Sequence, residues 1–169
     1  CERHGGAKAV ARLMPKSRSA KALATTKNNR WLSEMTHCIF QAGFVWRVVD
    51  RKWDDFEDVF FGFPPEKILM LSPDQIDRFA QNPRIIRNRQ KVLSIQANAQ
   101  YIVDIQQEHG SFGRFVSRWP EDDLIGLFQH MKKHGSRLGG MSGQRVLRNM
   151  RKDTFVVTGD VVRCLRRAN

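Results

Sequence analysis

A glycine-rich segment at residues 138–143 has the composition of a turn that binds phosphate. When such a turn begins a helix, its backbone N–H groups have no partner within the helix, and they bind phosphate without reading base sequence. We expect Gly140, Ser142 and Gly143 to supply these donors. Four basic side chains near the turn are expected to add charge-assisted contacts: Lys133, Arg137, Arg145 and Arg148.

An acidic residue, Asp160, follows this turn after a short apolar stretch and begins the last predicted helix. A carboxylate beside a bound strand is a candidate for chemistry on that strand. The alternative is that Asp160 only caps its helix, a position where Asp is common.

The charge of the chain points to nucleic acid as the partner. The 169 residues carry a net charge of +12, with a sequence pI of about 10.4. The excess lies at the two ends, with +7 over residues 1–30 and +8 over residues 132–169, whereas residues 31–131 carry −3. This distribution argues against a uniformly basic surface and favours a nucleic-acid contact at the glycine turn.

Composition also restricts the class of protein. The chain has no apolar run long enough to span a membrane, no apolar segment typical of a secretory signal, and three cysteines, too few for a disulfide framework. We therefore expect no membrane partner and a cytoplasmic location.

Helical periodicity and cap residues predict an all-α fold of about nine or ten short helices. Residues 1–30 are predicted to form a basic arm with a short helix at 7–14, and residues 155–157 a short extended stretch. Ser72, Pro73 and Gln75 have the spacing of a capping box. The predicted helices cover residues 31–44, 54–61, 65–71, 73–81, 85–108, 111–119, 122–134 and 142–151, with a last helix ending at 167.

Five motifs along residues 31–145 resemble the bacterial 3-methyladenine DNA glycosylase I family, a branch of the helix-hairpin-helix glycosylase superfamily. They are FQAGFVW at 40–46, FPPEK at 63–67, RIIRNRQK at 84–91, GSF at 110–112 and KKHG at 132–135. The resemblance implies one two-lobe helix-hairpin-helix glycosylase domain over residues 31–169, with the hairpin at about 132–152. It also implies that a damaged base from duplex DNA is held between the lobes and excised as an alkylated purine.

The resemblance places Trp46 in the base pocket. A flipped base is held between aromatic faces, and a purine made cationic by methylation is attracted more strongly to an indole. Without the resemblance, Trp46 would be interpreted as a core residue. Four nearby residues complete the predicted base-binding set: Cys38, Phe40, Gln41 and Phe44.

Two carboxylates are candidates for catalysis. Loss of a base passes through an oxocarbenium-like state, which a carboxylate stabilises while it positions water. Asp160 lies 22 positions after Leu138, close to the spacing of the superfamily's catalytic Asp. The family has a Glu where this chain has Cys38, and Glu34, four residues earlier on the same helix face, is the expected substitute.

Two further features of the resemblance differ in this chain. Bifunctional members of the superfamily carry a hairpin lysine where this chain has Gln144. Gln cannot form an imine, which favours monofunctional hydrolysis, although Lys152 lies nearby.

The family's structural zinc needs three or four ligands, and only His4 and Cys164 fall near the expected positions, so we predict that the metal is lost and no cofactor is used. The other histidines have no metal-ligand spacing and are predicted to be surface or capping residues.

The sequence therefore predicts a monomeric, monofunctional DNA glycosylase for base excision repair of alkylated purines (3-methyladenine-like) in duplex DNA, located with the bacterial nucleoid. Two alternatives remain open. One is a non-catalytic helix-hairpin-helix DNA-binding module, and the other is a basic helical protein that binds RNA.

Overall fold

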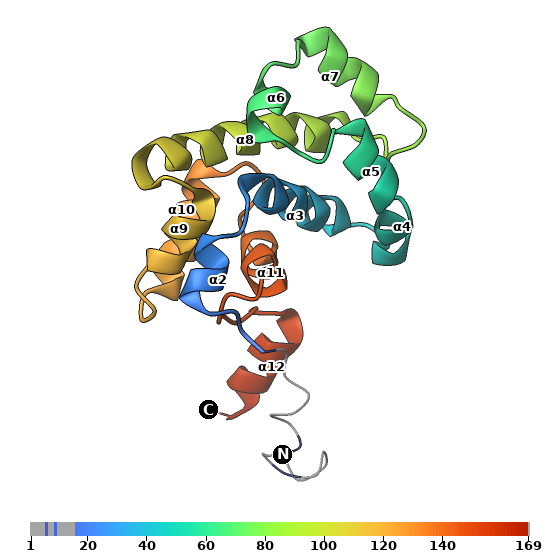
Figure 1. Ribbon diagram of the computed structural model, residues 1–169. Helices are drawn as coiled ribbons and strands as arrows, with labels where there is room; N and C mark the ends of the chain where they lie inside the picture. The colour runs from blue at the N-terminus through green and yellow to red at the C-terminus, as the bar shows by residue number, and fades with distance from the viewer. Residues whose placement is uncertain (1–5, 7–8, 10–15, 169) are drawn as a thin grey trace.

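The computed structural model describes residues 6, 9 and 16–168 (Figure 1). This part of the chain contains α-helices and no β-strand, which confirms the all-α fold class. The helices are α2 (Ala20–Ala24), α3 (Asn28–Gln41), α4 (Trp46–Arg51), α5 (Trp53–Val59), α6 (Pro65–Leu69), α7 (Pro73–Ala80), α8 (Arg89–His109), α9 (Phe112–Arg118), α10 (Leu124–His134), α11 (Met141–Asn149) and α12 (Gly159–Ala168).

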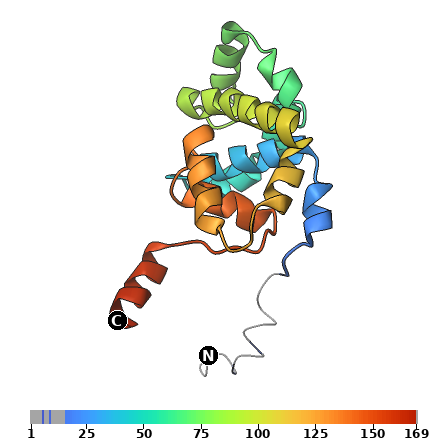
Figure 2. The same cartoon turned by 90° about the vertical axis from the view of Figure 1, so that its left-hand side faces the viewer.

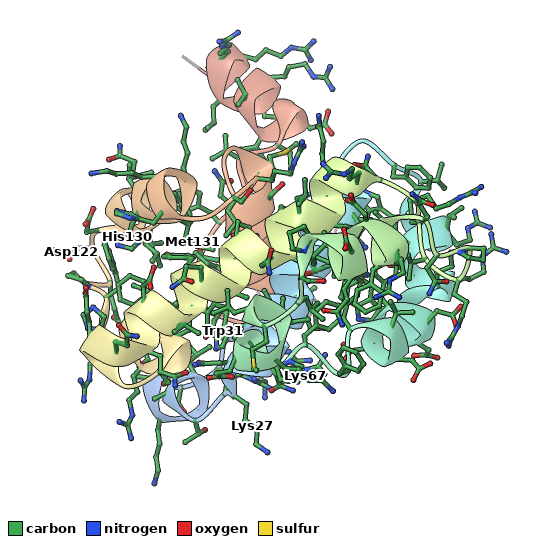
Figure 3. All side chains as sticks on the ribbon, turned by 90° about the horizontal axis from the view of Figure 1, so that it is seen from above. Lys27, Trp31, Lys67, Asp122, His130 and Met131 are labelled. Carbon is green, nitrogen blue, oxygen red and sulfur yellow. The ribbon has the colours of Figure 1, made fainter. Side chains whose placement is uncertain are left out.

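Two helices, α3 and α8, pack against each other in the middle of the molecule (Figure 1). Helices α6 and α7 pack on α8, α11 packs on α3, and α2 packs on α9. Trp31, near the centre of Figure 3, is fully buried and lies 5.2 Å from Phe112 between ring centroids. One continuous apolar core thus fixes α3 relative to both α8 and α11.

Side-chain caps explain where several helices begin. The predicted capping box is confirmed, because Ser72 accepts from the Gln75 backbone N–H and Gln75 accepts from that of Ser72. Asn88 caps α8 by accepting from Lys91, and Gly110 ends it with a φ of 80°. Asp123 caps α10.

The structure differs from the predicted elements at several boundaries. Helices α2 and α4 were not predicted, because five- and six-residue helices carry too little periodicity to recognise. The boundary at residue 30 falls inside α3, and Leu23 is buried, so part of the expected basic arm belongs to the helical body. Helix α8 begins at Arg89 rather than at 85, after its Asn88 cap. Most of the predicted helix at 7–14 lies outside the described residues.

The hairpin of α10 and α11 is built around two close approaches of the backbone. A Cβ on Gly143 would lie 2.5 Å from the Leu138 carbonyl oxygen, and a Cβ on Gly135 would lie 2.8 Å from that of Met131. Gly140, which precedes α11, has a φ of 58° and a ψ of −133°, which favours glycine. These glycines and the buried Leu138 fix the turn where α11 begins.

Helix α12 projects away from the other helices (Figure 2). Within the described residues, no helix is both long and apolar enough to cross a membrane.

Candidate functional site

A cavity of about 220 Å³ lies between the end of α3, the start of α4 and the start of α11. It unites three of the predicted base-binding residues with two of the predicted phosphate-binding residues. Its lining consists of Cys38, Gln41, Ala42, Gly43, Trp46, Met141, Ser142 and Arg145. The cavity thus joins sequence segments about a hundred residues apart.

Trp46 is the aromatic wall of this cavity and is 48% exposed. It begins α4, three residues after Gly43, which has a φ of 71°. The guanidinium carbon of Arg145 lies 4.2 Å from the centroid of the indole. The alternative that Trp46 is a core residue does not fit this exposure.

Cys38 connects the cavity to a carboxylate. Its thiol donates to Oε1 of Glu34, at 3.3 Å, and the Nδ2 group of Asn149 donates to the same oxygen at 2.7 Å. Burial, together with the negative charge of Glu34, raises the pKa of the Cys38 thiol far above its usual range. Cys38 is therefore a neutral thiol and a hydrogen-bond donor, not a thiolate nucleophile.

Gln41 connects the cavity to a second carboxylate, since its Nε2 group donates to Oδ1 of Asp50 at 2.9 Å. His37 lies between the two carboxylates, with Nε2 2.9 Å from Asp50 and Nδ1 3.9 Å from Glu34. Burial alone would lower the pKa of His37, but the two carboxylates outweigh it and raise that pKa. Neither His37 nor Asp50 was predicted from the sequence as a candidate site residue. The i,i+3 spacing of Glu34 and His37, which places them on one helix face, was the signal available for His37.

Glu34 lines a separate cavity of about 240 Å³ rather than the one at Trp46. The side chain of Glu34 is 21% exposed, so this cavity gives it access to water. Three arginines share the lining, together with Thr26, Asn149 and Met150: Arg18, Arg30 and Arg151. Glu34 is connected to the Trp46 cavity through its hydrogen bond with Cys38.

The two phenylalanines of the predicted base-binding set lie elsewhere. Phe40 is fully buried and packs edge-on against Phe56, with ring centroids 4.7 Å apart. Phe44 is exposed on the turn between α3 and α4 and does not line the cavity. Phe40 therefore supports the site as core packing.

Two of the three backbone N–H donors expected at the glycine turn are already engaged within the protein. The Gly143 N–H donates to the carbonyl of Leu138 at 3.1 Å, and the Ser142 N–H to that of Gly139 at 3.4 Å. In the described part of the chain, the backbone N–H groups of Gly140 and Met141 have no hydrogen-bond acceptor. Gly140 and Met141 are thus among the donors available for a phosphate, whereas Gly143 is required for the close packing of the turn.

The basic side chains near the glycine turn differ in the contacts that they make within the protein. Lys133 is exposed, Arg137 donates to the side chain of Gln90 at 2.6 Å, and Arg148 donates to the carbonyl of Thr154 at 3.1 Å. Arg145 lies over Trp46.

The basic run at 84–91 is largely engaged within the protein. Arg84 pairs with Asp55 and Asp58, and Arg89 with Asp77. Lys91 donates to the carbonyls at the end of α3.

Asp160 lies on the projecting α12, where its side chain is 80% exposed and pairs with Arg163. It lines neither the Trp46 cavity nor the Glu34 cavity. The catalytic role of Asp160 stays a prediction, as does that of Glu34.

Of the two residues considered for imine chemistry, Gln144 accepts from the backbone N–H of Val157 at 2.8 Å, and Lys152 is buried.

The described residues do not fit the family's zinc site. Across residues 16–168 no group of three His, Cys, Asp or Glu side chains could hold a metal ion, and Cys164 is exposed on α12. His4 lies outside the described residues. His130, labelled beside Met131 in Figure 3, belongs to an aromatic cluster on α10, and its Nδ1 lies 3.0 Å from the Tyr101 hydroxyl.

The fold is similar to that of solved 3-methyladenine DNA glycosylases I. The 3-methyladenine DNA glycosylase I of Staphylococcus aureus, solved to explain its 3-methyladenine recognition, has a TM-score of 0.64 over 73% of this chain and 76% of that one, at 24% identity. A solution structure of a 3-methyladenine DNA glycosylase I covers 90% of this chain and 84% of that one, with a TM-score of 0.61 and 20% identity. These similarities show the fold.

The methyladenine glycosylase family model matches residues 22–164, and the chain therefore belongs to that family. DNA-3-methyladenine glycosylase 1 of Escherichia coli (strain K12) is 32% identical over 76 residues, which is 45% of this chain. The DNA-3-methyladenine glycosylase of Haemophilus influenzae has the same identity over the same length. The matched region spans about two fifths of the length of these curated relatives, 41% in each case.

Proposed function

We propose that this protein is a monofunctional DNA glycosylase that hydrolyses the N-glycosidic bond of alkylated purines in duplex DNA. The observation that carries the proposal is the cavity in which Trp46 faces the start of α11. It brings a ring that can stack on a flipped base next to a turn that can hold a phosphate. Membership of the methyladenine glycosylase family and the relatives named for DNA-3-methyladenine support it.

The cavity suits a base that carries positive charge. Two of its polar walls, Cys38 and Gln41, are uncharged, and each is hydrogen bonded to a carboxylate behind it. The one charged side chain of the lining, Arg145, lies over the indole of Trp46. An indole face adds attraction for a cation. A purine methylated on a ring nitrogen is cationic in DNA, so the cavity would bind it in preference to an undamaged purine.

The charge of such a base also reduces the chemistry that the protein must supply. The bond from C1′ to the purine nitrogen breaks, its electron pair goes to the purine, and the base leaves neutral without protonation. Water then adds to C1′ and loses a proton to solvent or to a carboxylate. The remaining task is to stabilise the oxocarbenium-like state and to position water.

Between the two candidate carboxylates, the geometry favours Glu34 as a positioning residue. It accepts the thiol proton of Cys38, and Cys38 lines the cavity. Its negative charge therefore lies one hydrogen bond from the cavity lining. Asp160 would need α12 to fold back before it could act.

A non-catalytic DNA-binding module is the second candidate function. It is favoured by Cys38 at the position of the family Glu and by the exposure of Asp160. Such a module would bind duplex DNA without releasing a base.

Product analysis separates the two. Randomly methylated duplex DNA is incubated with the protein, free bases are resolved by chromatography, and strands are analysed before and after alkali. The proposal predicts release of 3-methyladenine and strands that break only after alkali, because an abasic site remains. Binding without base release would establish the module, and strand breaks without alkali would indicate lyase chemistry.

Two carboxamide variants then test the carboxylates. We expect Glu34→Gln to lower the single-turnover rate of base release by about tenfold or more, with DNA affinity unchanged. Asp160→Asn is expected to change the rate by less than about twofold. The opposite order would identify Asp160 as the catalytic carboxylate and require α12 to move on DNA.

The finer features of the partner and location are also part of this proposal. We infer a monomer that acts on duplex rather than single-stranded DNA and is located with the nucleoid in the bacterial cytoplasm. The bacterial relatives and the basic ends of the chain support this.

A further inference from the structure

Arg145 covers a face of Trp46 inside the candidate base cavity. Its guanidinium carbon lies 4.2 Å from the indole centroid, and both side chains line the same cavity. Trp46 is half exposed and Arg145 half buried, so the cation covers the ring on the side of the cavity. A base stacking on this face would have to displace Arg145.

The indole is the main attachment of Arg145 in the free protein. Among residues 16–168, no carboxylate lies within ion-pair distance of its guanidinium, and no hydrogen bond from its side chain is formed. Arg148, one turn further along α11, is attached differently, because it donates to the Thr154 carbonyl at 3.1 Å. A cation–π contact at a half-exposed ring is a weak attachment, and Arg145 can exchange it for a stronger one.

A DNA phosphate at the start of α11 would be a stronger partner for Arg145 than the indole. The free backbone N–H groups of Gly140 and Met141 mark where a DNA phosphate would sit, and Met141 and Ser142 line the cavity with Arg145. Arg145 follows Met141 by four residues, about one helical turn, so its long side chain leads from the cavity toward that position. A charge-assisted, bidentate contact with phosphate is stronger than an exposed cation–π contact.

We propose that Arg145 is a gate that couples DNA-backbone contact to opening of the base pocket. In the free protein its guanidinium covers Trp46, and on DNA it transfers to a phosphate and leaves the indole face open. This inference rests on the proposed function for the identity of the base, but the transfer itself requires only undamaged duplex DNA.

The gate would also add to the discrimination between damaged and undamaged bases. The Trp46 indole loses its cation–π contact when Arg145 moves to a phosphate, and only a cationic base restores an equivalent contact. Arg145 would therefore be a specificity-determining residue, in addition to contacting DNA.

The transfer can be followed at the Trp46 indole N–H by ¹H–¹⁵N NMR, with Trp46→Phe assigning the signal among the four tryptophans. We expect Arg145→Gln to shift this signal, and undamaged duplex to move the signal of the parent protein toward the Arg145→Gln position. In the control Arg84→Gln, which removes a cation already paired with Asp55 and Asp58, duplex should still produce the shift. A Trp46 signal that does not move toward the variant position on adding duplex would overturn the gate, whether or not the protein is a glycosylase.

Binding of the free base provides a second readout, with 3-methyladenine as the probe and adenine as its unmethylated control. Arg145→Gln should bind 3-methyladenine about two- to fivefold more tightly than the parent without DNA, because the competing cation is gone. Duplex containing an abasic-site analogue should raise the affinity of the parent but not that of the variant. Weaker or unchanged base binding in Arg145→Gln would show that Arg145 helps to hold the base and would contradict the gate. If neither protein binds the base, the proposed function fails, and the NMR result still decides the gate.

Discussion

At the scale of single residues, the cavity has two uncharged polar walls with carboxylates behind them and one cation, Arg145, in its lining. Cys38 and Gln41 face the cavity, while Glu34 and Asp50 accept their hydrogen bonds from behind. His37 lies between the two carboxylates and would be charged at mildly acidic pH. This arrangement favours a cationic base without placing an ionised acid against it.

The position of His37 predicts how stability depends on pH. Because its pKa is raised in the folded protein, protonated His37 stabilises the fold fully below the unfolded pKa, near 6.5, and this stabilisation is lost as pH rises through the folded pKa. We expect the melting temperature of the parent to fall more than that of His37→Gln as pH rises from about 6 to about 8.5. Thermal unfolding across this range checks it; parallel pH profiles of the two proteins would contradict it.

At the scale of elements, the site depends on how α11 begins. Gly143 lies in the first turn of α11, where its backbone packs on the Leu138 carbonyl. Any side chain there must push the hairpin turn away from the cavity wall formed by Met141 and Ser142.

Gly143→Ala should therefore destabilise the protein by about 1–3 kcal/mol, since a Cβ at 2.5 Å from backbone oxygen cannot be accommodated without a shift. Gly159→Ala is the matched control, because a Cβ there meets no atom within 4 Å. Chemical denaturation measures both. Equal stabilities for the two variants would show that the hairpin tolerates the extra group.

Much of the helical framework was predictable because its signals are local. Ser72 with Gln75, and Gly110 at the end of α8, are caps whose residue types reveal their role. Helices α2 and α4 were not predictable, because such short helices are stabilised by what they pack against. The location of Trp46 in a pocket came from family resemblance, since periodicity alone indicated a core residue.

The contacts that define the candidate site were less accessible to sequence analysis. The Arg145–Trp46 and Asn149–Glu34 contacts join α11 to segments about a hundred residues earlier, and no local pattern predicts such a pairing. The same reason explains why Gly143 was predicted as a phosphate ligand rather than as a packing residue. Glycine in a turn fits either role until the neighbouring backbone is known.

At the scale of the whole molecule, positive charge is distributed unevenly. The middle of the chain is net negative, and several of its arginines are already paired, as Arg84 is with Asp55 and Asp58. The excess of positive charge lies toward the two ends of the sequence, and in the part of the chain that the structure describes the hairpin cations Lys133 and Arg145 form no ion pair. Affinity for DNA should therefore depend on a limited set of hairpin cations.

Salt dependence tests this distribution. Lys133→Gln should reduce the slope of log affinity against log salt by about 1, because one phosphate contact is lost. Arg84→Gln, which removes the same charge from a paired position, should leave the slope nearly unchanged. Fluorescence anisotropy with undamaged duplex at several salt concentrations provides the slopes. Equal effects of the two variants would indicate a diffuse, nonspecific electrostatic surface.

The most direct test of the central claim is the single-turnover rate of 3-methyladenine release from methylated duplex by the parent, Trp46→Ala and Phe44→Ala. Both aromatic side chains are about half exposed, but only Trp46 lines the cavity. Because base–aromatic stacking contributes roughly 1–3 kcal/mol, Trp46→Ala should slow release by about tenfold or more, while Phe44→Ala stays close to the parent. Rapid release by Trp46→Ala, or loss of release only in Phe44→Ala, would show that the base is held elsewhere.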